Sequence, residues 1–411
     1  AVVDAVDCFG DTPLHWAVYQ KRANIAGYLQ TLSINKPRNW NNMTALQLAV
    51  TMNRTVDESH STLDLIRQLV DAGGDMEIRN RGGGTCLHLA TELGHQDRVS
   101  LLIDMGANIE AEERAGKKPL HLAAIRGDVA TMKVLMNKGA GIEAMDRDNK
   151  TPLYVAAEEG SEVAAEFLIE AGAKKNARNL GGSTVLHVSC KNKDEGVARL
   201  LLSKGADKDA IDNEGMTPLH QASERSSFAI VKLLIEHGAV VGVRDGQGMT
   251  PLHLAAANNH DSPEVVSCMQ LLLQSGADKE ARDKWGRTPL HAAASRGRQE
   301  AVQYLVDVAG ADMGAEDDRG MTSFLVAASQ GKDDVVQMFL DRGESIEARS
   351  KLGHTPLILA AKKGHEKTVQ MLLDRGADAE ARGQDGLTAM DAARRRKRYM
   401  EMGTSTVGEF M

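Results

Sequence analysis

The chain has 411 residues, of which 42% are hydrophobic and only 3% aromatic, and it carries a net charge of −8. This length suits two or three ordinary domains or one extended repeat array, and the apolar content of small and aliphatic residues favours closely packed helices over a β-sandwich. The negative charge argues against a protein whose main task is to grip a phosphate backbone, because such proteins carry a dominant positive field.

One position recurs along the whole chain. It is threonine in eleven cases and lysine in the twelfth, and most steps between successive positions are 33 residues long. Two steps are clearly longer, with 41 residues from Thr44 to Thr85 and 38 from Thr250 to Thr288, and the step from Thr288 to Thr322 is 34. The positions are Thr12, Thr44, Thr85, Lys118, Thr151, Thr184, Thr217, Thr250, Thr288, Thr322, Thr355 and Thr388. They predict twelve repeats, which we number in chain order.

The elements expected within each repeat follow in a fixed order. A turn comes first, with glycine two positions before the recurring threonine in ten repeats and Asn42 or Asn149 in the other two, which is typical of a positive φ angle. The threonine then caps a first helix, often with proline directly after it and histidine three positions later. An apolar pair about sixteen residues after the cap marks the buried face of a second helix, and Gly-Ala ends that helix.

The stretches "NEGMTPLHQASERSSFAIVKLLIEHGA" and "KWGRTPLHAAASRGRQEAVQYLV" show this order and resemble ankyrin repeats. The likeness covers nearly the whole chain. It implies an all-α solenoid of helix-turn-helix repeats with short β-hairpin fingers, in which the imidazole of the motif bonds back to the cap threonine. The resemblance thus gives a structural role to the pairs Thr12 and His15, Thr217 and His220, Thr250 and His253, and Thr288 and His291.

We expect the ankyrin repeat array to span residues 1–393 and a frayed or truncated basic tail to span residues 394–411. Ala1 lies eleven positions before Thr12, as Ala107 does before Lys118. The first repeat therefore starts in register, and we expect the chain to be a fragment of a longer protein. The basic run from Arg394 to Arg398 is either a localisation or anionic-surface patch or a solvated helix end.

The irregular repeats carry their extra residues near positions 53–61 and 258–264. We place both insertions between the first and second helix of a repeat, where harmless loop variation and a partner contact are both open. Repeat two also has Ala45 and Gln47 where most repeats have proline and histidine. This departure predicts a strained junction or a gap in the stack.

The sequence offers no motif for catalysis, for a cofactor or for a metal. Capping explains seven of the thirteen histidines, the other six form no HExxH pattern, and no P-loop or G-x-S-x-G elbow is present. The four cysteines are scattered, which indicates reduced thiols in an intracellular protein, and no apolar run reaches the length of a membrane span. We therefore expect no enzyme, no cofactor and no bound metal, and a location in the cytoplasm or alternatively the nucleus.

The resemblance implies that partners are bound by the finger tips and by the exposed face of the first helices. Phe9 and Trp285 fall at the tips, where a solvated finger does not need large apolar groups, although packing of Trp285 on the neighbouring finger is an alternative. Methionine and arginine beside the cap are adaptable contacts. The candidate residues gather in repeats seven to ten and are Met216, Glu224, Arg225, Met249, Asn258, Trp285, Arg287, Arg296 and Met321, with Phe9 and Tyr19 in repeat one.

These observations predict a non-catalytic, monomeric scaffold or adapter that binds a protein partner, and not nucleic acid, through its concave face and finger tips. The alternative is the recognition arm of a larger protein, such as an immune-type NTPase receptor, a kinase or a lipase, whose catalytic domain lies outside this chain. A third class is the cytosolic domain of a channel. The partner itself is not named by the sequence, because one repeat scaffold hosts many unrelated functions.

Overall fold

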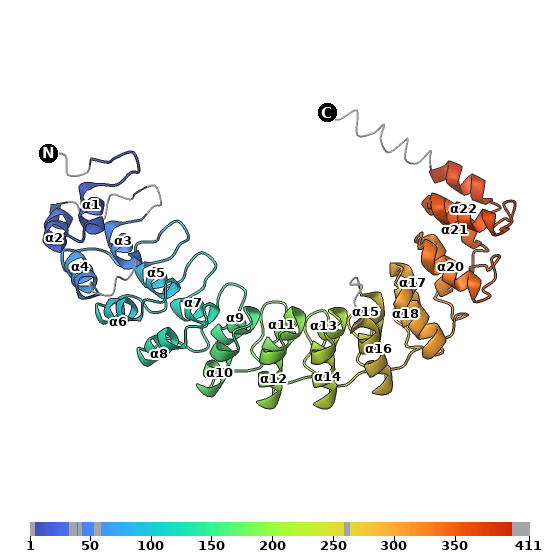
Figure 1. Cartoon of the computed structure of the whole chain (residues 1–411), viewed down its shortest axis with the longest axis horizontal. Coiled ribbons are helices and arrows are strands. Elements are labelled where there is room, and N and C mark those ends of the chain that lie inside the picture. Colours follow the sequence, from blue (N-terminus) through green and yellow to red (C-terminus); the bar gives the residue numbers. More distant parts are fainter. Residues whose placement is uncertain (1–4, 33–38, 40–42, 53–58, 259–263, 397–411) are drawn as a thin grey trace. The chain divides into compact units, whose positions relative to one another are not determined.

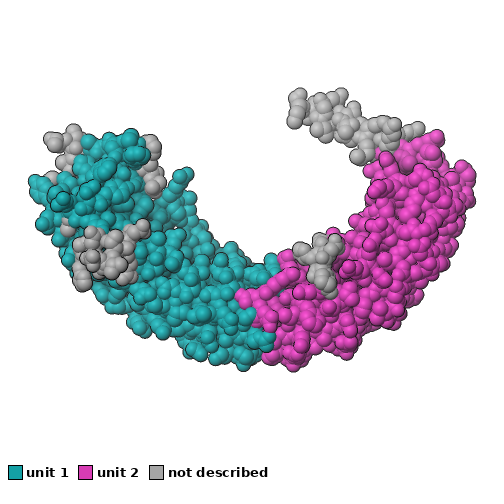
Figure 2. All heavy atoms as spheres, viewed as in Figure 1, with its two compact units in different colours: residues 1–192, 196–206 teal, residues 193–195, 207–411 magenta. Residues whose placement is uncertain are grey.

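A computed structural model of the whole chain describes residues 5–32, 39, 43–52, 59–258 and 264–396 (Figure 1). The chain divides into two compact units, which we describe separately (Figure 2). Unit 1 comprises residues 1–192 and 196–206, and unit 2 comprises residues 193–195 and 207–411.

Unit 1 is a stack of helix pairs. Its helices are α1 (Pro13–Tyr19), α2 (Ala23–Leu32), α3 (Ala45–Thr51), α4 (Ser59–Asp71), α5 (Cys86–Glu92), α6 (Gln96–Asp104), α7 (Pro119–Ile125), α8 (Val129–Asn137), α9 (Pro152–Glu158), α10 (Glu162–Glu170), α11 (Val185–Asn192) and α12 (Glu195–Ser203). The first helices of successive repeats contact one another from α1 to α11, and the second helices do so from α2 to α10. The result is two layers of helices with the apolar core between them.

Unit 2 repeats this plan. Its helices are α13 (Pro218–Glu224), α14 (Phe228–Glu236), α15 (Pro251–Ala257), α16 (Glu264–Gln274), α17 (Pro289–Arg296), α18 (Gln299–Gln303), the π-helix η1 (Tyr304–Val308), α19 (Ser323–Ser329), α20 (Asp333–Asp341), α21 (Pro356–Lys363) and α22 (Glu366–Asp374). Residues 389–396 are also helical and form the first helix of repeat twelve. This helix crosses the boundary that we expected at residue 393, and the rest of the expected tail lies outside the described residues.

The predicted capping of the first helix is confirmed. In repeat seven, the backbone N–H of Thr217 donates to Nδ1 of His220 at 3.1 Å, and the Thr217 hydroxyl lies 2.9 Å from the same nitrogen. Nε2 of His220 then donates to the carbonyl oxygen of Met249 in the next repeat at 3.1 Å. Each such imidazole therefore caps its own helix and also forms a hydrogen bond to the next repeat. The same pair of contacts to Nδ1 is made by Thr12 to His15, Thr250 to His253 and Thr288 to His291.

The fingers are turns, which differs from the β-hairpins that we expected. In repeat eight, the backbone N–H of Asp245 donates to the carbonyl of Met249 at 2.9 Å, and the Asp245 carboxylate accepts from the N–H groups of Gln247 and Met249. Gly248 has a φ of 79° at the tight point of this turn. The Asp245 carboxylate accepts from these N–H groups, so they take no part in a ladder between the two arms. In the described residues the one β-type pairing is an isolated bridge between Arg178 and Thr184.

The irregular repeats keep the stack continuous where they are described. Both long insertions lie between the first and second helix, after Thr51 and after Ala257, as predicted. The expectation of a gap at repeat two is wrong, because Gln47 takes over the histidine role. Its side-chain oxygen accepts from the N–H of Thr44 at 3.0 Å, and its amide donates to the carbonyl of Ile78 in repeat three at 2.7 Å.

The extra residue between Thr288 and Thr322 lies in η1. In the regular repeat seven, the N–H of Ala239 donates to the carbonyl of Leu234, five residues earlier, whereas the N–H of Ala311 reaches the carbonyl of Leu305, six residues earlier. A π-helical turn is the usual form of a single residue inserted into a helix. The insertion is thus absorbed without shifting the repeats that follow.

Candidate partner-binding site

The finger of repeat nine presents Trp285 at its tip. The buried carboxylate of Asp283 accepts from the backbone N–H groups of Trp285 and Arg287, both at 2.9 Å, and thereby shapes the turn. The Trp285 side chain is left 46% exposed. A large apolar residue in this position covers little of the core, so it is available for contact with another molecule.

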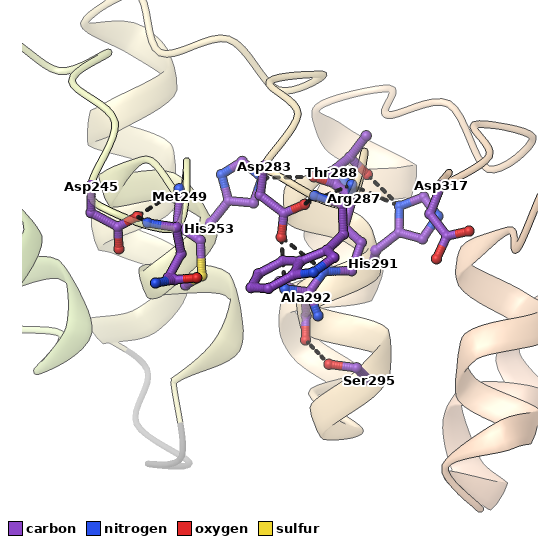
Figure 3. A network of polar contacts seen from close by, with 12 residues as sticks. Asp245, Met249, His253, Asp283, Arg287, Thr288, His291, Ala292, Ser295 and Asp317 are labelled. Atoms are coloured by element: carbon purple, nitrogen blue, oxygen red, sulfur yellow. Dashed lines mark hydrogen bonds and ion pairs between the residues drawn. The ribbon is translucent and has the colours of Figure 1, made fainter. Parts of the chain in front are cut away.

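Arg287 is held beside this tryptophan. Its guanidinium donates from Nε to Asp283 Oδ2 at 2.8 Å, and its Nη2 lies 2.7 Å from the same oxygen (Figure 3). The guanidinium carbon lies 4.4 Å from the centre of the Trp285 ring, in stacking contact. Burial works to raise the pKa of Asp283, but the hydrogen bonds from Arg287 and from the two backbone N–H groups outweigh it and lower that pKa. The finger thus keeps an ionised Asp283 that holds Arg287 in place.

The next finger completes a small hollow at this point. Trp285, Arg287, Asp318 and Arg319 line a volume of about 270 Å³. The N–H of Asp318 donates to the carbonyl of Trp285 at 3.0 Å, so the two fingers are joined through their backbones. Trp285 therefore contacts the neighbouring finger, as the alternative held, yet its ring stacks on Arg287 of its own finger and stays half exposed.

A further exposed tip was missed in the sequence. Leu352 occupies the position of Trp285 in repeat eleven and is 60% exposed. Backbone bonds of the same kind continue from Arg319 to Lys351 and from Leu352 to Gln384. The spacing of three residues before the cap is the signal that would have found Leu352.

The expectation that the methionines beside the cap are exposed is wrong for two of them. Met216 and Met321 are both buried, and Met249 is half-buried. Met321 packs against Leu325 and Leu359 in one apolar cluster, so its side chain lies over the first helices rather than at the tip of the finger.

The predicted residues near the carboxyl ends of the first helices are also partly exposed and partly buried. Glu224 and Arg296 are exposed, and Arg225 is half-buried. Asn258 is buried, and its amide donates to the carbonyl oxygen of Glu224 at 2.7 Å and contacts the hydroxyl of Ser226. Asn258 therefore joins repeats seven and eight, and it offers little surface to a partner.

Unit 1 carries a separate aromatic group in repeat one. Phe9 and Tyr19 are both exposed, as expected, and so is Trp16, which was not among the predicted residues. The rings of Trp16 and Tyr19 meet edge to face with centres 5.9 Å apart, and the Trp16 indole donates to Asp7 at 3.0 Å. Trp16 lies on the exposed face of α1, four residues after the cap.

The buried motif histidines are neutral and have a structural role. Burial lowers the pKa of His88, His121, His220, His253 and His291 below the ordinary 6.5, although the acceptor carbonyls work in the opposite direction. In each ring Nδ1 accepts and Nε2 donates, which requires the neutral form. Within the described residues no group of three or more His, Cys, Asp or Glu is placed to hold a metal ion.

The thiols are similarly unreactive in the core. Cys86, Cys190 and Cys268 are buried, whereas Cys8 is exposed. Burial raises the pKa of the Cys268 thiol to about 12, so it is not a thiolate at neutral pH. None of the helices in the described part of the chain has the length and apolar character that crossing a bilayer requires.

Comparison with known proteins agrees with the repeat geometry. A family profile described as ankyrin repeats (3 copies) matches the chain in overlapping segments: residues 56–146, 105–179, 121–212, 153–245, 186–268, 229–317, 262–350, 308–383 and 324–400. These segments cover more than half of the chain. No curated protein matches it significantly.

Proposed function

Since this chain belongs to the ankyrin-repeat family, whose repeats generally serve protein–protein interaction, we propose that it is a non-catalytic binding module that takes a protein partner on the fingers of repeats nine and ten. It acts as a monomeric intracellular adapter. The partner contacts the Trp285 side chain and the hollow that Trp285 shares with Asp318 and Arg319.

One observation carries this proposal: Trp285 is half exposed while its neighbour Arg287 is already fixed by Asp283. Tryptophan and arginine are enriched among the residues that dominate binding energy at protein interfaces. A side chain that is ordered before binding loses less conformational entropy when the partner arrives. The finger of repeat nine combines both features.

The test compares three forms of the chain as bait for proteins from cells that express it. We expect the wild-type chain and the Leu352→Ala variant to retain the same partner, and the Trp285→Ala variant to lose about 2 kcal/mol of binding free energy. Leu352 is the matched control, because it lies at the same position of the finger in repeat eleven. Equal retention of the partner by Trp285→Ala and wild type would overturn the proposal.

The melting temperature separates this outcome from simple unfolding. The Trp285 ring stacks on Arg287 of its own finger and is half exposed, so its loss should leave the melting temperature nearly unchanged. A large drop in melting temperature without a binding defect would instead assign Trp285 to packing.

A further inference from the structure

A group of cationic side chains lies where the first helices of repeats nine to twelve end. In these four repeats the seventh and eighth residues after the cap are Ser295 and Arg296, Ser329 and Gln330, Lys362 and Lys363, and Arg395 and Arg396. Five of the eight are cations and none is an acid. In repeat seven the same two positions hold Glu224 and Arg225. The excess of positive charge at these two positions therefore begins at repeat nine.

The second helices of repeats ten and eleven add to this group near their amino ends. We define the basic strip as Arg296, Lys332, Lys362, Lys363, Lys367, Arg394, Arg395 and Arg396. All of these residues are exposed except Lys332, which is half-buried. The overall charge of −8 hides this local excess of positive charge.

The strip is continuous from one repeat to the next. Arg296, Lys332 and Lys367, which come from three successive repeats, line one hollow of about 530 Å³. Gly297 and Gly331 also line it, as do two acids, Asp333 and Asp334. At the far end, Arg396 of repeat twelve lies directly against Gly364, the residue that follows Lys363. Contacts between α17, α19 and α21 place the intervening helix ends side by side.

None of the eight cations forms an ion pair in the described part of the chain, although Lys362 interacts through space with Asp385 and Arg394 with Asp391. The second-helix layer of the same unit behaves differently: Arg342 pairs with Asp307 at 2.6 Å and Arg375 pairs with Asp341 at 3.1 Å. The acids closest to the strip are few. Asp333 already accepts from the Thr368 hydroxyl at 2.5 Å, which leaves Asp334, Glu366 and Asp385 as the exposed acids beside the strip.

We propose that the basic strip binds an acidic peptide segment of a partner protein. This inference rests on the proposed function and adds that one segment of the protein partner is acidic. Carboxylates form charge-assisted hydrogen bonds with lysine and arginine, and a row of exposed cations matches an extended run of Asp and Glu. The strip contains no aromatic side chain on which a base could stack, and the net negative charge of the chain disfavours a long polyanion, so nucleic acid fits less well.

The experiment measures fluorescence anisotropy of a labelled decapeptide of alternating Asp and Glu titrated with the full chain. We expect binding that weakens as salt is raised, because exposed charges are screened. The triple variant Lys362→Glu, Lys363→Glu, Arg395→Glu should bind about tenfold more weakly or worse, since it removes three charge-assisted contacts. The matched control is Lys138→Glu, Lys204→Glu, Lys232→Glu, which changes the net charge equally outside the strip and should bind like wild type.

Three results would overturn the proposal: no binding of the decapeptide, equal loss in both triple variants, or tighter binding of a thymidine oligonucleotide of the same charge. Unchanged melting temperatures of both triple variants show that the folds are intact. The titration does not use Trp285, so Trp285→Ala should bind the decapeptide like wild type. Failure of the titration alone rejects the basic strip, whereas failure of the Trp285 comparison alone rejects the finger site.

Discussion

His253 of repeat eight donates from Nε2 to the carbonyl oxygen of Arg287 in repeat nine at 3.0 Å. The same ring accepts at Nδ1 from the backbone N–H of Thr250 at 3.2 Å. The backbone of Arg287 is therefore held by the repeat before it, while its side chain is held by Asp283 in its own finger. The capping network and the candidate site meet at this residue.

This network predicts that the stability of the chain falls in mild acid. The folded pKa values of His88, His121, His220, His253 and His291 lie below 6.5, so the unfolded chain binds more protons than the folded chain once the pH drops below that value. Their contribution to stability is complete above pH 6.5 and is lost as the pH falls toward the folded pKa values. We expect the melting temperature, measured by circular dichroism, to decrease over this range.

The chain supplies its own control for this effect. Gln47 makes the equivalent bonds without a titrating group, so His220→Gln should retain most of the contacts and cost about 1 kcal/mol at neutral pH. The melting temperature of the variant should depend less on pH than that of wild type. An unchanged or steeper dependence would contradict the assignment of the acid effect to these rings.

A second prediction concerns the finger of repeat nine. Asp283→Ala removes the acceptor of two backbone N–H groups and the anchor of Arg287, and we expect a loss of about 2 kcal/mol in the stability of this finger. Hydrogen exchange of the amides of residues 283–287 measures it directly, and exchange there should accelerate. Trp285→Ala, which leaves these bonds intact, is the matched control and should exchange like wild type. Faster exchange in both variants would show that the ring itself holds the turn.

The sequence predicts the helix pairs and the caps well because the same local signals recur at the same positions in each repeat. Proline after the cap and histidine three positions later are short-range signals, and neighbouring repeats bury one another's apolar faces. Variation at one position is harder to interpret. Gln47 in repeat two and Asp391 in repeat twelve both replace the histidine, and both bond to the cap threonine. We expected a defect at Gln47, but an amide or a carboxylate can accept from the cap N–H as the imidazole does.

Side-chain direction and isolated exceptions could not be predicted. The position beside the cap is the same for Met216, Met249 and Met321, yet Met249 is half-buried whereas the other two are buried. The basic strip was not predicted either. Its cations belong to four repeats and come together only when the helices stack. Arg98 is a further case, since a charged residue stands where most other repeats bury a small or apolar side chain.

Arg98 leads to the third prediction. It is almost fully buried on α6, and its Nη1 donates to the carbonyl oxygens of Val50 and Met52, both at 2.6 Å, at the carboxyl end of α3. Arg98→Met keeps the length but leaves these two acceptors without their donor, so we expect a loss of about 3 kcal/mol in local stability. Hydrogen exchange in α3 should accelerate, with Arg98→Lys intermediate. Protection equal to wild type in Arg98→Met would show that the two carbonyl oxygens do not depend on this guanidinium.

The fourth prediction concerns the extra residue of repeat nine, which we place in η1. Val308 is 71% exposed within η1, and deleting it restores a spacing of 33 residues between Thr288 and Thr322. The helix should become continuous, with an unchanged or higher melting temperature. The matched control deletes Lys232, which is exposed on the regular helix α14. That deletion rotates Leu233 and Leu234 away from the core and should cost about 3 kcal/mol or more. Equal damage from the two deletions would mean that the π-helical turn is required where it stands.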